Sequence, residues 1–198
     1  TEILDSQENK ISSDGGKVLS SLGYRISKDT RDNRFNPTSG YYYALSEQFA
    51  GLGGDVNYLS SVLKGSYYYK YDYVDLIVGI GAEYGNIEGL GENISKSNRF
   101  FLGGRKIRGF DSSGIGPRVS ANSSASAVGG NNYYTGRVSI RSGIGIPSET
   151  ALQWTVFTDF GTLWGVDDTT NNYAVSTDQK GLRMSFGYGF QWETPIGP

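Results

Sequence analysis

Strict alternation of apolar and polar residues over stretches of about ten positions is the feature of this chain that most constrains its fold. From Leu182 to Glu193, every second side chain is apolar and the residues between them are polar or glycine. Successive side chains of a β-strand point to opposite faces, whereas a helix would mix the two kinds around its surface. The segment is therefore predicted to be a strand whose apolar face consists of Leu182, Met184, Phe186, Tyr188, Phe190 and Trp192.

The same alternation recurs along the chain. It is clear in residues 76–85 and 152–161, although Ile77 stands among the polar and glycine positions of the first run and Phe157 among those of the second. Weaker strand-like runs cover residues 18–29, 41–49, 59–71 and 133–144. The clear runs last about ten residues, which suits a strand tilted across a bilayer better than the five or six residues typical of soluble sheets. Seven strands are expected.

The connections between these strands alternate between short and long. The short turns are residues 33–40, 72–75 and 147–150. The longer connections are residues 50–58, 86–132 and 165–181. In an up-and-down sheet, this alternation places every short turn at one rim and every long loop at the other, as in outer-membrane barrels. The sequence therefore predicts an all-β, antiparallel up-and-down transmembrane β-barrel, with a soluble β-sandwich and a passive porin as alternatives.

Composition narrows the range of functions. The 198 residues include 29 Gly, 5 Pro and 14% aromatic residues, which fits many strands joined by turns. The chain has neither Cys nor His, so it lacks a thiol nucleophile, the usual zinc ligand and the usual general base. We therefore expect a protein that is not an enzyme and uses no cofactor. The net charge of −2 and the scattered basic residues disfavour a nucleic-acid partner.

Membrane insertion, if it occurs, would use strands. No run of 18 apolar residues exists, so a transmembrane helix is not expected. The mean hydropathy of −0.40 is compatible with a barrel, because its strands alternate apolar and polar residues. The residues after Thr1 do not resemble a signal peptide, so a targeting segment would lie outside this chain.

The long connection 86–132 contains an Arg-Gly-Phe tripeptide at Arg108, Gly109 and Phe110. Arginine brings five fixed donors and a permanent charge, glycine permits positive φ, and phenylalanine offers a rigid apolar anchor. This combination suits a loop tip that docks into a polar cavity. A solvated surface loop that happens to carry an arginine is the alternative.

Several motifs occur in the order found in one known family. They are Asp29–Asp32 with Phe35–Gly40, Phe100–Gly104 leading to Ile107–Phe110 and Gly114–Pro117, Val128–Asn131, and Phe157–Trp164. Together they resemble the outer-membrane assembly factors of Gram-negative bacteria, the BamA and TamA superfamily, also called bacterial surface antigens. The resemblance implies that residues 18–198 are about seven consecutive strands of a sixteen-stranded barrel. Residues 1–17 would be the remnant of a preceding loop, and the closing residues 191–198 a turn before a further strand.

The resemblance also implies a functional loop. In the family the long loop folds back into the barrel, where its arginine meets an inward-facing carboxylate. The functional motif here is Ile107, Arg108, Gly109 and Phe110, and its expected partners on the wall are Asp159 and Phe157. The residues themselves agree, because Asp159 belongs to the polar set of its strand and a cation would offset its desolvation. The supporting glycines are Gly103, Gly104, Gly129, Gly130 and Gly161.

A second acidic anchor is less clear from the sequence. The preceding strand offers Arg137, Ser139 and Arg141 on its inward face, where the family often has an acid. Glu83 and Glu193 are left as alternatives.

The function implied by the resemblance is folding and insertion of other β-barrel proteins, without ATP or covalent chemistry. Expected partners are the outer-membrane lipid bilayer, unfolded outer-membrane client proteins and the lipoproteins of an assembly machinery. A two-partner secretion or TamA-like transporter of the same superfamily is the alternative. Five upstream transport-associated repeats would favour assembly, and two would favour secretion.

Overall fold

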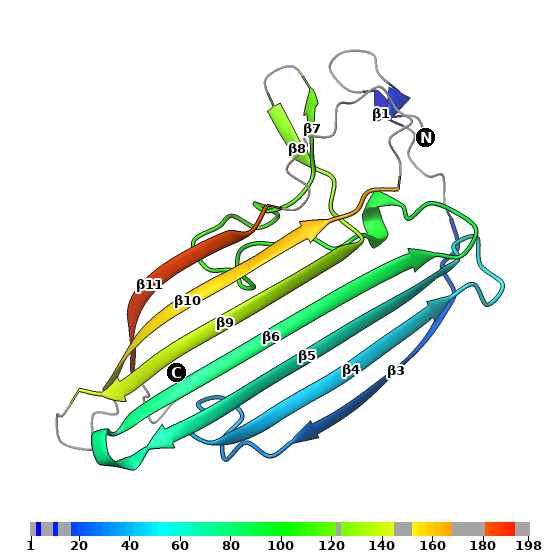
Figure 1. Ribbon diagram of the computed structural model, residues 1–198. Helices are drawn as coiled ribbons and strands as arrows, with labels where there is room; N and C mark the ends of the chain where they lie inside the picture. The colour runs from blue at the N-terminus through cyan, green and yellow to red at the C-terminus, as the bar shows by residue number, and fades with distance from the viewer. Residues whose placement is uncertain are drawn as a thin grey trace.

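Seven long antiparallel strands form one curved sheet (Figure 1). The structure, a computed structural model, describes residues 3–4, 10–11, 17–121, 124–144, 152–167 and 181–192. The strands are β3 (Ser21–Asp29), β4 (Gly40–Ala50), β5 (Tyr58–Tyr71), β6 (Leu76–Gly89), β9 (Asn132–Gly143), β10 (Leu152–Trp164) and β11 (Arg183–Trp192). Their order in the sheet is the order in the chain, which confirms the predicted all-β, up-and-down fold.

The remaining elements are small. They are β1 (Ile3–Leu4), β2 (Lys10–Ile11), β7 (Arg118–Ala121), β8 (Ser124–Ala127) and the one-turn 3-10 helices η1 (Asp72–Val74) and η2 (Lys96–Asn98). The described residues contain no helix with the length and apolar character needed to cross a membrane. Strands β7 and β8 form a hairpin within the long connection.

Strand β6 continues to Gly89, so the long connection begins at residue 90 rather than at residue 86. The outward alternation of apolar residues ends at Tyr84, because Asn86 and Glu88 follow on that face. Backbone pairing nevertheless continues, with Gly89 opposite Tyr58 on β5. Inward-facing Ile87 packs there in a small cluster with Ala50, Tyr58 and Ile94. The apolar band that predicted the strand is thus shorter than the strand itself.

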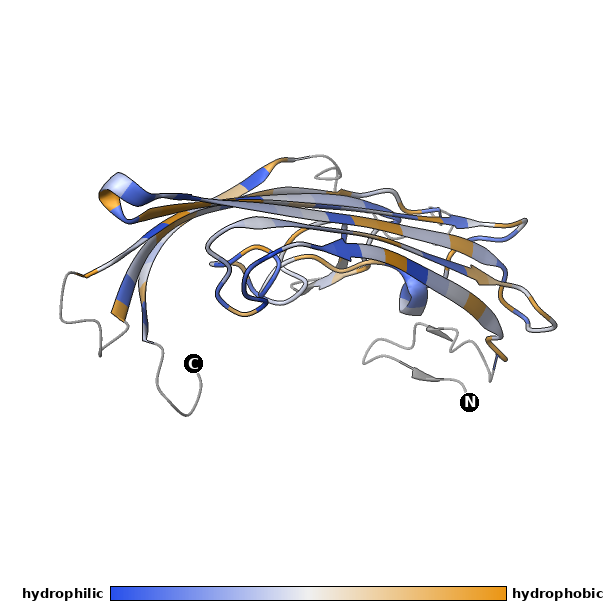
Figure 2. Cartoon of the chain, turned by 90° about the horizontal axis from the view of Figure 1, so that it is seen from below, coloured by the Kyte–Doolittle hydropathy of each residue, from blue (hydrophilic) through white to orange (hydrophobic). Residues whose placement is uncertain are grey.

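The two faces of the sheet differ as the period of two predicts. On edge strand β11, Phe186 is 77% exposed and Trp192 is 62% exposed, so neither lies in the interior of a compact sandwich. The outward face of β3 is also exposed, at Leu22 and Ile26. The long connection lies beneath the curved sheet, on its concave side (Figure 2). The polar residues Glu83, Arg137 and Asp159 contact this connection, so the polar set faces the concave side. This connection packs against that face through Leu102, Ile107 and Ile115.

The turn between β3 and β4 is held by the side chain of Asp32. One carboxylate oxygen accepts a 2.6 Å hydrogen bond from the Thr38 hydroxyl, and the other accepts bonds from the backbone N–H groups of Thr38 and Ser39. These bonds lower the pKa of Asp32 to about 2, with the Thr38 hydroxyl contributing most. Their contribution to stability is therefore complete above the ordinary carboxyl pKa and is lost as the pH falls through about 2.

Some of the sequence-based predictions lie outside the described residues. These are the turn 147–150, most of the connection 165–181, residues 193–198 with the alternative anchor Glu193, and most of residues 1–17.

Candidate functional site: the docked loop

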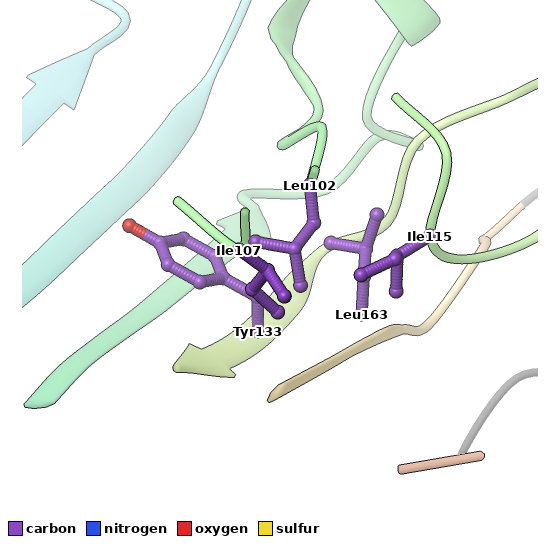
Figure 3. Close-up of a cluster of buried hydrophobic side chains, with 5 residues drawn as sticks. All are labelled: Leu102, Ile107, Ile115, Tyr133 and Leu163. Carbon is purple, nitrogen blue, oxygen red and sulfur yellow. The ribbon is translucent and has the colours of Figure 1, made fainter. Parts of the chain in front are cut away.

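The long connection is attached to the sheet by an apolar cluster. Leu102, Ile107 and Ile115 of the connection pack with Tyr133 of β9 and Leu163 of β10 (Figure 3). All five are at most 4% exposed, and Ile107 is completely buried. Burying one such side chain stabilises by about 1.5–3 kcal/mol, so the cluster is a substantial part of what holds the loop.

Gly161 on β10 makes the space for Ile107. A Cβ atom at Gly161 would lie 2.8 Å from Ile107 Cδ1 and 2.5 Å from the backbone oxygen of Tyr134. Glycine within a strand often marks a place where another segment approaches closely, and here that segment is the loop. Gly130 has a similar role, since a Cβ atom there would lie 2.8 Å from the backbone oxygen of Trp164.

The other predicted glycines shape the loop itself. Gly103, Gly104 and Gly129 have φ values of +136°, +56° and +74°, a region that favours glycine. A Cβ atom at Gly103 would also lie 2.0 Å from the backbone oxygen of Asp111. Gly103 and Gly104 precede the motif, and the N–H of Gly104 donates to the backbone oxygen of Phe110, which closes the turn that presents Ile107 to the wall. Gly129 lies against Phe100, where a Cβ atom would be 2.8 Å from the backbone oxygen.

The structure brings Arg108 and Asp159 together. Arg108 Nε donates to Asp159 Oδ2 at 2.7 Å, and Nη2 donates to Oδ1 at 2.8 Å. The backbone N–H of Arg108 adds a third bond to Oδ2 at 3.0 Å. Asp159 is completely buried on the inward face of β10. A bidentate, charge-assisted contact of this kind offsets the desolvation of a buried carboxylate and fixes the orientation of the loop.

A second arginine shares the same carboxylate. Arg137 of β9 lies directly opposite Asp159 in the strand register, and its Nε donates to Asp159 Oδ1 at 2.9 Å. Arg137 Nη2 also donates to the backbone oxygen of Arg105 at 3.1 Å, so this side chain links wall and loop. The sequence analysis did not identify this role. The cross-strand register of the β9–β10 pair would have revealed it, because both residues belong to inward-facing sets.

Phe157 lies under the arginine of the motif. The guanidinium carbon of Arg108 is 3.2 Å from the centre of the Phe157 ring, which is a close cation–π contact. Gly187 of β11 pairs with Phe157 and leaves room for its ring, since a Cβ atom there would lie 2.5 Å from Phe157 Cζ. Gly109 has φ +86° and lies against Ser185 of β11. An aromatic ring on the polar face is thus explained by the loop that covers it.

The second anchor involves Glu83, but its partner is Lys106 rather than Arg108. Lys106 Nζ donates to Glu83 Oε1 at 2.6 Å and to the Tyr133 hydroxyl at 2.8 Å. The Tyr133 hydroxyl donates to the same carboxylate oxygen at 2.5 Å. Glu83 lies on β6, so this network holds the loop two strands away from Asp159. The two ion pairs fix both ends of the segment 106–108.

Lys106 and Glu83 are expected to be energetically coupled. In a double-mutant cycle with Lys106→Met and Glu83→Gln in the full-length protein, we expect a coupling free energy of about 1–3 kcal/mol, measured by denaturant unfolding. Lys64 is the natural control, because its amine is 3.8 Å from Glu83 and its side chain is half exposed. Coupling of Lys64 to Glu83 should be below about 1 kcal/mol. Equal coupling for the two lysines would contradict a specific Lys106 anchor.

The chemistry available at this site is binding and positioning. Within the described ranges, no three His, Cys, Asp or Glu side chains gather as metal ligands would. The charged groups that dock the loop are instead paired with one another, Lys106 with Glu83 and both Arg108 and Arg137 with Asp159. The arrangement ties the loop to β6 and β10 by ion pairs and to β9 by a hydrogen bond from Arg137 to the backbone oxygen of Arg105. Gly109 of the loop lies beside Ser185 of β11.

Comparison with known proteins gives the site its family context. The outer membrane protein assembly factor BamA of Neorickettsia risticii is 36% identical over 194 residues, which are 98% of this chain and 25% of that protein. A SAM50-like protein of Schizosaccharomyces pombe is 27% identical over 190 residues, which are 91% of this chain and 39% of that protein. The chain therefore spans between a quarter and two fifths of the length of these relatives.

The fold has a counterpart among solved structures. The crystal structure of BamA from Haemophilus ducreyi lacking POTRA domains 1-3 matches with a TM-score of 0.77 and 21% identity, over 90% of this chain and 37% of that chain. The family model of the Omp85 superfamily domain matches residues 2–198. These matches confirm the resemblance inferred from the motifs, and the chain belongs to the Omp85 superfamily.

Proposed function

We propose that this chain is part of an outer-membrane β-barrel that folds and inserts other outer-membrane proteins. The observation that carries the proposal is the docking of the Ile107–Phe110 motif on the inner wall through Arg108 and Asp159. The names of the relatives support a role in assembly, since one relative is named an outer membrane protein assembly factor and another a SAM50-like protein. The proposed activity is not enzymatic and needs no cofactor.

The docked loop gives the proposed barrel a stiff wall. It is held to β6 and β10 by ion pairs and to β9 by a hydrogen bond from Arg137, and it lies beside Ser185 of β11. A wall held in this way resists distortion, so bilayer thinning and strand opening would concentrate at another part of the barrel. Client strands could then be templated on an exposed edge by β-augmentation. The chain itself would be the structural part that holds the loop.

The proposed setting is the outer membrane of a Gram-negative bacterium. The exposed apolar face of the sheet would contact the lipid bilayer, as the outward residues of a barrel do. The proposed protein partners are unfolded outer-membrane clients and the lipoproteins of an assembly machinery. A two-partner secretion or TamA-like transporter is the alternative in the same superfamily, and the names of the relatives favour assembly over it.

Arg108→Ala in the full-length protein tests the proposal. We expect a several-fold loss of folded client barrels in cells that depend on the variant, because the loop loses the two guanidinium hydrogen bonds to Asp159 and keeps only the bond from the backbone N–H of residue 108. Folded clients are measured by heat-modifiable migration on gels. Asp159 keeps Arg137 as a partner in this variant, so the barrel itself is expected to fold.

Arg34→Ala is the matched control, because Arg34 is 80% exposed in the turn between β3 and β4. Normal client folding in Arg108→Ala would refute the role of the docked loop. Loss of export of a single partner protein, with client barrels unaffected, would favour the transporter.

A further inference from the structure

A basic chamber lies on the inward face of the sheet, next to the docked loop. It is a cavity of about 460 Å³ that extends from Arg31, in the turn between β3 and β4, to Arg105 and Lys106 in the loop. Tyr42 and Tyr68, near the short-turn ends of β4 and β5, also line it. The chamber therefore runs from the loop toward the rim of the short turns.

The chamber has an excess of positive charge. Its lining contains the cations Arg31, Lys64, Arg105, Lys106 and Arg137, and the single acid Glu83. Two further acids lie behind this lining, because Arg31 pairs with Asp29 and Arg137 pairs with Asp159. Five cations thus face three acids even when these partners are counted.

The excess positive charge has two sources. One is Arg105, and the other is the pair Lys64 and Lys106, which share the single carboxylate of Glu83. Within the part of the chain that the structure describes, the Arg105 side chain makes no hydrogen bond or ion pair, and it is exposed at the chamber. Lys64 and Lys106 share Glu83, at 3.8 Å and 2.6 Å. Arg105 and Lys64 are therefore available to an incoming anion without breaking the contacts that dock the loop.

We infer that this chamber binds acidic polypeptide segments that enter from the rim of the short turns. Guanidinium and ammonium groups on a concave wall focus a positive potential and form charge-assisted hydrogen bonds with carboxylates. The chamber lies on the inward face, away from the apolar face that would contact lipid, so a polypeptide fits it better than a lipid headgroup. The inference rests on the proposed function in one respect: it takes the acidic segment to be part of an unfolded client chain.

A titration with a labelled acidic peptide tests the inference. Full-length protein in detergent micelles is titrated with fluorescent octaglutamate, and binding is followed by anisotropy at low and high salt. We expect saturable binding that weakens steeply with salt, because the contacts are ionic. Arg105→Glu is expected to weaken binding by about tenfold, since it replaces an attraction by a repulsion. Lys64→Gln should weaken it by a smaller factor.

The control is Lys96→Glu, which makes the same change of charge on exposed η2 at the opposite rim. Its binding curve should match that of the unmodified protein. The inference would be overturned if octaglutamate did not bind, or if Arg105→Glu bound it as tightly as the unmodified protein. Binding of inorganic polyphosphate but not of the peptide would also overturn it. Client folding is measured separately in the same variants, so loss of peptide binding and failure of the proposed function give distinct results.

Discussion

Replacing Asp159 by asparagine is expected to undock the loop and to destabilise the full-length barrel by about 3–5 kcal/mol. The carboxylate is completely buried and accepts hydrogen bonds from both Arg108 and Arg137. Asparagine has nearly the same shape but no charge, so two guanidinium groups would face each other without a counter-charge. The free energy of unfolding should fall more in Asp159→Asn than in Arg108→Ala, because Arg108→Ala leaves the carboxylate paired with Arg137.

Two measurements distinguish undocking from general unfolding. Limited proteolysis should cleave the connection near Lys106 in Asp159→Asn and spare it in the unmodified protein, because trypsin cuts after lysine and arginine. Denaturant unfolding of the folded barrel gives the change in free energy. Asp111→Asn is the control, since Asp111 is an exposed residue of the same loop. Resistance to trypsin equal to that of the control would show that Asp159 does not hold the loop.

Adding a methyl group at Gly161 is expected to displace Ile107. The new Cβ atom would lie 2.5 Å from the backbone oxygen of Tyr134 and 2.8 Å from Ile107 Cδ1. The oxygen belongs to the paired strand β9 and cannot move away cheaply, so the loop must shift. Overpacking of this kind costs about 1–3 kcal/mol for Gly161→Ala, and Gly161→Val should cost more.

Gly189→Ala provides the matched control on the inward face of the neighbouring strand β11. A Cβ atom there would have its nearest neighbour, Thr155 Cγ2, at 3.7 Å, which is ordinary contact. This variant should be neutral or slightly stabilising, because glycine is unfavourable within a strand. Both variants are compared by denaturant unfolding and by client folding in cells. An equal effect of the two alanines would mean that the loop does not need the space above Gly161.

Aromatic side chains on both faces of the sheet explain the positions of two strand glycines. Gly85 and Gly136 pair across from aromatic residues, whose rings occupy the space that a Cβ atom would fill. Tyr133 lies over Gly85 on the inward face, and Phe160 lies over Gly136 on the outward face. At these positions the glycine and the aromatic residue belong together, because the ring fills the space that the glycine leaves.

The sequence by itself determined the fold class, the inward and outward faces, and the pairing of Arg108 with Asp159. Strand periodicity assigns every side chain to a face, so the inward position of Asp159 followed from local order. The motif resemblance then indicated which loop residue would meet it.

Only the tertiary structure decided how the charges are shared. The contacts of Arg137 depend on the register of β9 against β10, and those of Lys106 with Glu83 and Tyr133 depend on the path of the loop. The extent of β6 to Gly89 likewise depends on backbone pairing with β5 beyond the apolar band. Periodicity reports which face a residue occupies, whereas register and loop path arise from contacts between segments distant in the chain.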